Sequence, residues 1–79
     1  MTRIRVVCDR EFLGKIFIGT DREERPTIYC EGPKEWILRM IVGWAAKKCR
    51  ELKVDMNDAE AVLAQIAAQV EPPLRAEID

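Results

Sequence analysis

The sequence contains few side chains that could act as catalytic groups or hold a metal ion. It has no histidine and no serine, so a serine triad, a cysteine–histidine dyad and a histidine metal site are all absent. The carboxylates are scattered along the chain, and no glycine-rich phosphate-binding loop occurs. We therefore expect a protein that is not an enzyme and that has no cofactor and no metal site.

Cys8, Cys30 and Cys49 are the remaining groups with nucleophilic or metal-binding chemistry. Their odd number and wide spacing argue against a disulfide framework and against a zinc knuckle. Each cysteine falls on the expected inward face of its strand or helix, where a reduced thiol behaves as a small hydrophobic side chain. The pattern therefore predicts three buried thiols.

A second group of side chains has the chemistry of nucleic-acid binding. Basic and aromatic residues would share the outward face of a sheet, and they comprise Arg3, Arg5, Lys15, Phe17, Thr27 and Tyr29. Aromatic rings can stack on bases while Arg and Lys hold phosphates. The same residue types also occur on ordinary solvated sheet faces, and the net charge of −1 weakens attraction to nucleic acid. Both interpretations of this face stay open.

A third group lies in the stretch from Pro33 to Lys53, which has one charged residue, Arg39, between Trp36 and Ala46. At about 100° per residue, the helix stripe that faces the core comprises Leu38, Ile41, Val42, Ala45, Cys49 and Leu52. The roughly opposite side carries Trp36, Met40, Gly43 and Trp44. Either other elements cover that side, or Trp36, Met40 and Trp44 form a surface for a partner or for self-association, since Trp and Met are enriched at interfaces.

Alternating apolar residues predict three strands, at residues 2–8, 15–19 and 27–31. The expected inward residues are Ile4, Val6, Cys8, Ile16, Ile18, Ile28 and Cys30. Residues 9–14 and 20–26 would connect the strands. Connections this short favour antiparallel pairing.

Two helices follow the strands. The first occupies the stretch after Pro33, and the second begins after Asn57, a possible cap, and ends before Pro72. The apolar stripe of the second helix comprises Met56, Ala59, Leu63, Ile66, Ala67 and Val70, with Val62 at its edge. The sequence thus predicts an α+β fold, a three-stranded antiparallel sheet followed by two helices packed on one face (β-β-β-α-α). Residues 1–71 would form a single domain and residues 72–79 a loose C-terminal tail.

Charge is distributed unevenly along the chain. Residues 1–50 contain eleven Lys or Arg and seven Asp or Glu, whereas residues 51–79 contain two and seven. The two regions could attract each other within the molecule, or together they could steer a charged partner. Nothing resembles a signal peptide, and the longest apolar stretch is too short to span a membrane. We therefore expect a cytoplasmic protein.

In size and coarse architecture the chain resembles the small phage-encoded proteins that inhibit host machinery, the anti-CRISPR proteins among them. The resemblance carries no sequence motif. It implies a stoichiometric inhibitor that binds a nuclease or a guide-RNA complex and blocks DNA access or nuclease recruitment.

Three hypotheses about function remain from the sequence. The first is a protein-binding module that occupies the surface of a larger partner, such as a host nucleoprotein complex, through Trp36, Met40 and Trp44. Without a partner, this surface would form a two-fold homodimer. The second is a small nucleic-acid-binding protein that uses the outward sheet face. The third is a structural or assembly subunit.

Overall fold

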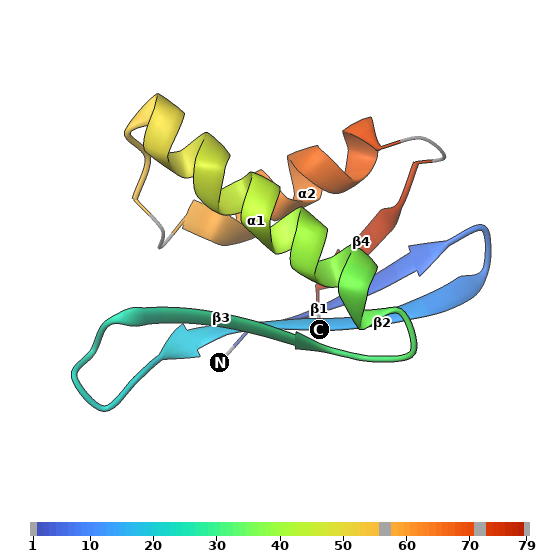
Figure 1. Cartoon of the computed structure of the whole chain (residues 1–79), viewed down its shortest axis with the longest axis horizontal. Coiled ribbons are helices and arrows are strands. Elements are labelled where there is room, and N and C mark those ends of the chain that lie inside the picture. The colour runs from blue at the N-terminus through green and yellow to red at the C-terminus, as the bar shows by residue number, and fades with distance from the viewer. Residues whose placement is uncertain (1, 56–57, 71–72, 79) are drawn as a thin grey trace.

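The structure, a computed structural model, describes residues 2–55, 58–70 and 73–78. The elements in these residues are β1 (Thr2–Cys8), β2 (Glu11–Thr20), β3 (Pro26–Glu31), α1 (Glu35–Leu52), α2 (Ala59–Gln69) and β4 (Arg75–Ile78). Figure 1 shows both helices on one side of the sheet. α1 packs on β2 and β3, and α2 packs on α1 and β4. The predicted α+β class is confirmed.

The sheet has the strand order β3-β2-β1-β4, and every neighbouring pair of strands is antiparallel. Ile4 lies opposite Ile16, and Ile16 lies opposite Cys30. Residues that face each other across antiparallel strands point to the same side of the sheet. The apolar residues of the alternating pattern therefore meet beneath the helices, where Ile4 and Ile16 are almost completely buried.

The connection between β1 and β2 is shorter than the sequence predicts. Asp9 and Arg10 both have positive φ angles, 46° and 69°, and form a two-residue hairpin turn. β2 therefore begins at residue 11 rather than at residue 15. The pairing register shifts between Val6 and Val7, and the resulting β-bulge in β2 accommodates Leu13 as an extra residue. Leu13, which the sequence placed in a connection, is a core residue with 2% exposure.

A fourth strand corrects the prediction of three strands and of a loose tail. Arg75–Ile78 pairs antiparallel with β1, with Ala76 opposite Val6. Leu74, immediately before the strand, is buried, and its N–H donates a hydrogen bond to the carbonyl of Ala67 at 3.0 Å. Two apolar residues among four give too weak an alternation for a strand to be recognised. The free edge of β1 supplies the hydrogen bonds that order this segment.

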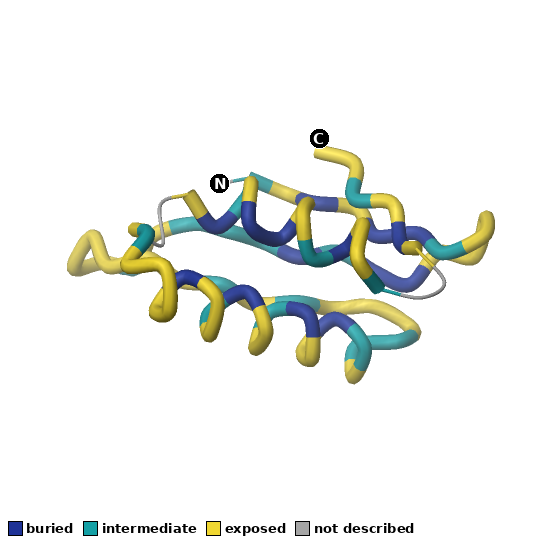
Figure 2. Tube along the Cα trace, turned by 90° about the horizontal axis from the view of Figure 1, so that it is seen from above, coloured by how far each residue is buried: buried dark blue, intermediate teal, exposed yellow. Residues whose placement is uncertain are grey.

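α1 presents to the core the stripe that its helical period predicts. Its buried residues are Leu38, Ile41, Ala45 and Cys49, and Val42 is half-buried. In Figure 2 the buried positions of the helix lie on the side that faces the other elements. Leu52, predicted to continue the stripe, is 56% exposed. It lies in the last turn, where α1 rises away from the sheet (Figure 1).

α2 also follows its predicted stripe. It buries Ala59, Val62, Leu63 and Ala67, while Ile66 and Val70 are half-buried. Val62, predicted at the edge of the stripe, belongs to the core cluster. The expected cap Asn57 and the expected stripe residue Met56 lie outside the described residues.

Candidate partner-binding site

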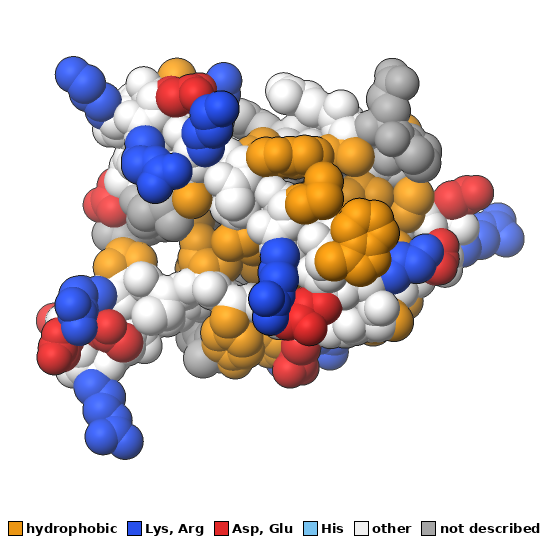
Figure 3. Space-filling view, viewed as in Figure 1, with side chains coloured by type: hydrophobic (Ala, Val, Ile, Leu, Met, Phe, Trp, Pro, Cys, Tyr) orange, Lys and Arg blue, Asp and Glu red, His pale blue; other side chains and the backbone are white. Residues whose placement is uncertain are grey.

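The solvent-facing side of α1 carries three large apolar side chains. Trp36, Met40 and Trp44, here called the tryptophan patch, are 65%, 45% and 44% exposed. Their four-residue spacing aligns them along one side of the helix. Figure 3 shows apolar side chains gathered at the centre of this face of the molecule. The described residues of the chain therefore cover these three side chains only in part.

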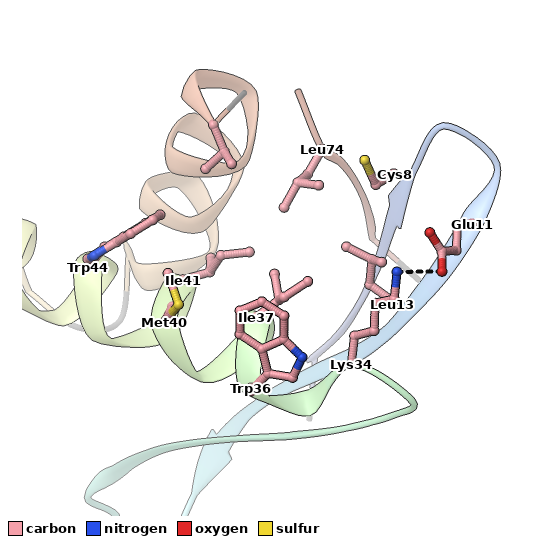
Figure 4. Close-up of a pocket in the computed structure, with 11 residues that line it drawn as sticks. Cys8, Glu11, Leu13, Lys34, Trp36, Ile37, Met40, Ile41, Trp44 and Leu74 are labelled. Carbon is pink, nitrogen blue, oxygen red and sulfur yellow. Dashed lines mark ion pairs between the residues drawn. The ribbon is translucent and has the colours of Figure 1, made fainter. Parts of the chain in front are cut away.

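A pocket of about 240 Å³ opens beside the tryptophan patch, and all three patch residues line it. Its inner wall is apolar and is formed by Leu13, Ile37, Ile41, Val70 and Leu74. Figure 4 shows that these side chains come from α1, from β2 and from the segment that leads from α2 to β4. Because ligand sites usually measure about 300–1,000 Å³, this apolar pocket suits one large side chain better than a cofactor.

The start of α1, which carries Trp36, is held against β2 by Lys34. The backbone N–H of Lys34 donates to the Leu13 carbonyl at 3.1 Å, and its ammonium lies 2.5 Å from the Glu11 carboxylate. The ion pair is partly exposed, so it contributes little to the free energy of unfolding. Its effect is to fix the edge of the apolar pocket, where both side chains lie (Figure 4).

The residues proposed for nucleic-acid binding share the sheet face opposite the helices. Arg3 lies opposite Phe17, Phe17 lies opposite Tyr29, and Arg5 lies opposite Lys15. The rings of Phe17 and Tyr29 stack, with centroids 4.8 Å apart and an interplanar angle of 8°. The structure thus brings these five residues onto one face, here called the outer face, and Thr27, opposite Gly19, lies on the same face.

The outer face also contains residues that the sequence did not predict there. Phe12, assigned to a connection, lies beneath the guanidinium of Arg5, with 5.5 Å between the guanidinium carbon and the ring centroid. A prediction that included the two-residue turn at residues 9 and 10 would have placed Phe12 on this face. Glu31 lies opposite Lys15, and Glu77 lies opposite Arg5. These carboxylates reduce the positive potential of the outer face.

The three cysteines are free thiols, but they are not equally buried. Cys49 is buried as predicted, whereas Cys8 and Cys30 are only half-buried, which corrects the prediction for those two. Burial raises the pKa of the Cys30 thiol, Glu35 raises it further, and Arg39 opposes both effects. A raised pKa lowers the thiolate fraction, so Cys30 is not an activated nucleophile.

Residues 2–55, 58–70 and 73–78 contain no group of three His, Cys, Asp or Glu side chains that could hold a metal ion. In this described part of the chain, neither helix has the length and apolar character needed to cross a bilayer. Comparison of the chain with protein-family models, with curated proteins and with solved structures found no match.

Proposed function

We propose that the chain is a small, non-catalytic protein-binding module whose binding surface is the tryptophan patch. The observation that carries the proposal is the exposure of Trp36, Met40 and Trp44 in a row on one helix. Large aromatic side chains and Met are concentrated at protein interfaces, and Trp supplies much of the binding free energy there. Full burial of one large apolar side chain contributes about 1.5–3 kcal/mol, and these three, being only partly covered, forgo a fraction of that. A partner that covers the patch would recover part of it.

The apolar pocket supports this proposal because it offers a receptor for a side chain of the partner. Strong interfaces place an aromatic or aliphatic anchor in a well-packed pocket near their centre. Here the inner wall of the pocket comes from buried or half-buried residues of α1, of β2 and of the segment between α2 and β4, and Leu13 and Ile41 among them are nearly fully buried. Such walls are already in place before binding, which limits the ordering cost of association.

The biological role that we propose is that of a phage-type inhibitor, which blocks a host defence or nucleoprotein complex by occupying its surface. The small size of the chain supports this role, and so does the absence of histidine and serine from its sequence. An inhibitor of this kind needs only a rigid surface that competes for a site. When no partner is present, two copies would cover each other's tryptophan patch across a two-fold axis.

The test places a photo-cross-linking amino acid at position 40, on the patch, and at position 15, on the outer face. The cross-linked protein is identified from cells, purified, and titrated with the unmodified chain. We expect position 40 to capture one dominant protein. Trp36→Ala and Trp44→Ala should each weaken its binding by about tenfold or more, because each removes a buried aromatic anchor.

Phe17→Ala is the matched control, since it removes an aromatic side chain from the outer face instead. It should leave the affinity of the purified partner unchanged. The proposal would be wrong if both Trp substitutions left the affinity unchanged while Phe17→Ala lowered it.

The outer face gives a second candidate function, single-stranded nucleic-acid binding. The stacked Phe17–Tyr29 pair beside Arg3 is the observation that favours it. Bases stack on exposed aromatic rings with little sequence preference. Anisotropy titration of a labelled oligonucleotide at several salt concentrations tests this function. Tight binding that weakens steeply with salt and disappears in Phe17→Ala would support it.

A further inference from the structure

A second, wider hollow continues the apolar pocket along α1. Its volume is about 550 Å³, and Trp44 and Val70 line both hollows. The two hollows are therefore neighbours along α1, the first beside β2 and the segment before β4 and the second between α1 and α2, and together they are here called the helix groove. The α1 side of the helix groove runs from Trp36 to Glu51, which corresponds to about 22 Å of helix.

The helix groove changes character along its length. The end beside Trp36 is the apolar pocket, whereas the other end is polar and is lined by Lys47, Lys48, Glu51, Gln65 and Gln69. Figure 3 shows Lys and Arg side chains gathered at the upper left, where Figure 1 places the C-terminal half of α1. No described residue forms an ion pair with Lys47 or Lys48. Two exposed ammonium groups are thus available at the polar end of the helix groove.

The charge at this end is positive overall. Arg50 and Lys53 lie at the same end of α1 as Lys47 and Lys48, and the carboxylates of this region are Glu51, which lines the second hollow, and Asp55. Like charges placed across an interface cost several kcal/mol, whereas opposite charges speed association and set its orientation. A basic segment would therefore be disfavoured in the helix groove, and an acidic one would be favoured.

We infer that the helix groove binds a segment of a partner protein in which large apolar side chains are adjacent to carboxylates. The inference rests on the proposed function and specifies the chemistry of the partner. An apolar side chain fills the apolar pocket, and the carboxylates pair with Lys47 and Lys48. The segment is a helix of about 15 residues, the length that spans the groove. The amide groups of Gln65 and Gln69 can donate further hydrogen bonds to the carboxylates.

Synthetic peptides test this inference without knowledge of the natural partner. The probes are 15-residue helical peptides that share the same leucine positions. Two acidic peptides carry their glutamates grouped at one end or at the other. Each has a counterpart with lysines in the places of the glutamates. The chain contains two tryptophans, and both line the helix groove, so their fluorescence reports its occupancy directly. We expect one acidic peptide to bind at least about tenfold more tightly than its lysine counterpart.

The double variant Lys47→Glu/Lys48→Glu should remove that preference. Arg50→Glu is the control, because it reverses one positive charge on the same turns of α1, where the double variant reverses two, and Arg50 does not line either hollow. Arg50→Glu should keep the preference for the acidic peptide. Circular dichroism of both variants establishes that α1 remains folded.

Equal affinity for the acidic and lysine peptides would overturn the inference. So would a preference for the acidic peptide that survives in Lys47→Glu/Lys48→Glu, and so would a lack of binding by every peptide. None of these outcomes would affect the proposed function, which is tested by the captured partner and the Trp variants. A wild-type dimer that the acidic peptides do not dissociate would also overturn the inference. Sedimentation would then identify a second copy of the chain as the occupant of the groove.

Discussion

Gly14 and Gly32 pack backbone against backbone where the end of β3 crosses β2. A Cβ atom added to Gly14 would lie 2.5 Å from both the Glu31 carbonyl and the nearest methyl of Leu38, and one added to Gly32 would lie 2.9 Å from the Leu13 carbonyl. Both glycines also have φ angles near +147°, which L-residues rarely adopt. This contact sets where α1 begins and therefore where the tryptophan patch lies.

We predict that Gly32→Ala lowers the free energy of unfolding by about 1–3 kcal/mol, through backbone strain and overpacking. Urea denaturation measures the change. Gly43→Ala is the control, because an added methyl at Gly43 would meet no atom within 4 Å. That substitution should raise the stability by up to about 1 kcal/mol, the helix-propensity difference between glycine and alanine. Equal effects at the two positions would contradict the close packing at Gly32.

Leu38 and Leu52 provide a matched pair of leucines in α1, one fully buried and the other 56% exposed. Leu38→Ala should destabilise the fold by about 2–5 kcal/mol, because it leaves a cavity in the core. Leu52→Ala should change the stability by about 0.5 kcal/mol or less. Denaturant unfolding of both variants measures the difference. A loss below about 1 kcal/mol for Leu38→Ala would mean that this side of α1 does not face the core.

The parts of the fold that sequence reasoning predicted are those in which periodicity coincides with burial. Ile4 and Ile16 follow the strand period, and Leu38 and Ile41 follow the helix period, so their inward positions could be read directly. The bulge at Leu13 could not, because it depends on a two-residue turn at residues 9 and 10 that lacks the usual Asn-Gly or Asp-Gly signal.

β4 could not be predicted for a different reason. Its stability comes from the edge of β1 and from the burial of Leu74, which lies outside the strand itself. The same limit applies to the site. The helical period indicates that Trp36, Met40 and Trp44 lie on one side of α1. The apolar pocket, however, depends on Leu13 and Leu74, which lie next to α1 in space but come from distant parts of the chain. A periodic pattern holds no information about such long-range contacts.

Truncation of the chain after residue 73 tests whether the C-terminal segment belongs to the fold. The truncated protein loses the burial of Leu74 and the pairing of Arg75–Ile78 with β1. We expect the free energy of unfolding to fall by at least about 1.5–3 kcal/mol, the usual contribution of one buried leucine. Thermal and urea unfolding measure the loss. An unchanged stability would restore the interpretation of this segment as a loose tail.

The thiols should differ in their rates of alkylation by iodoacetamide, measured by mass spectrometry of the native protein. Cys49 is buried and should react only on unfolding, whereas Cys8 and Cys30 should react in the folded state. Because the pKa of Cys30 is raised, its thiolate fraction is low near neutral pH, and its rate should increase as pH rises towards that pKa. Rapid labelling of Cys49 in the native protein would contradict the structure.

The raised pKa of Cys30 also links stability to pH. The folded state holds this proton more tightly than the unfolded state does, so the contribution to stability is fully present below the unfolded-state pKa. It is lost as pH rises through the higher folded-state pKa. The stability of the wild type should therefore fall in alkaline solution relative to that of Cys30→Ala. Equal pH dependence in the two proteins would contradict this sign.

Trp36→Ala and Trp44→Ala separate folding from association. Trp36 is 65% exposed and Trp44 is 44% exposed, so their removal should affect unfolding far less than Leu38→Ala does, by about 1 kcal/mol or less for Trp36. In an interface the same substitutions should each weaken association by more than about 1 kcal/mol, because they remove aromatic anchors. Sedimentation across a concentration series, for the wild type and both variants, measures self-association, and denaturant unfolding measures stability. If the wild type remained monomeric and both variants lost several kcal/mol of folding stability, the tryptophans would be core residues, and a binding surface would have to be sought on the outer face.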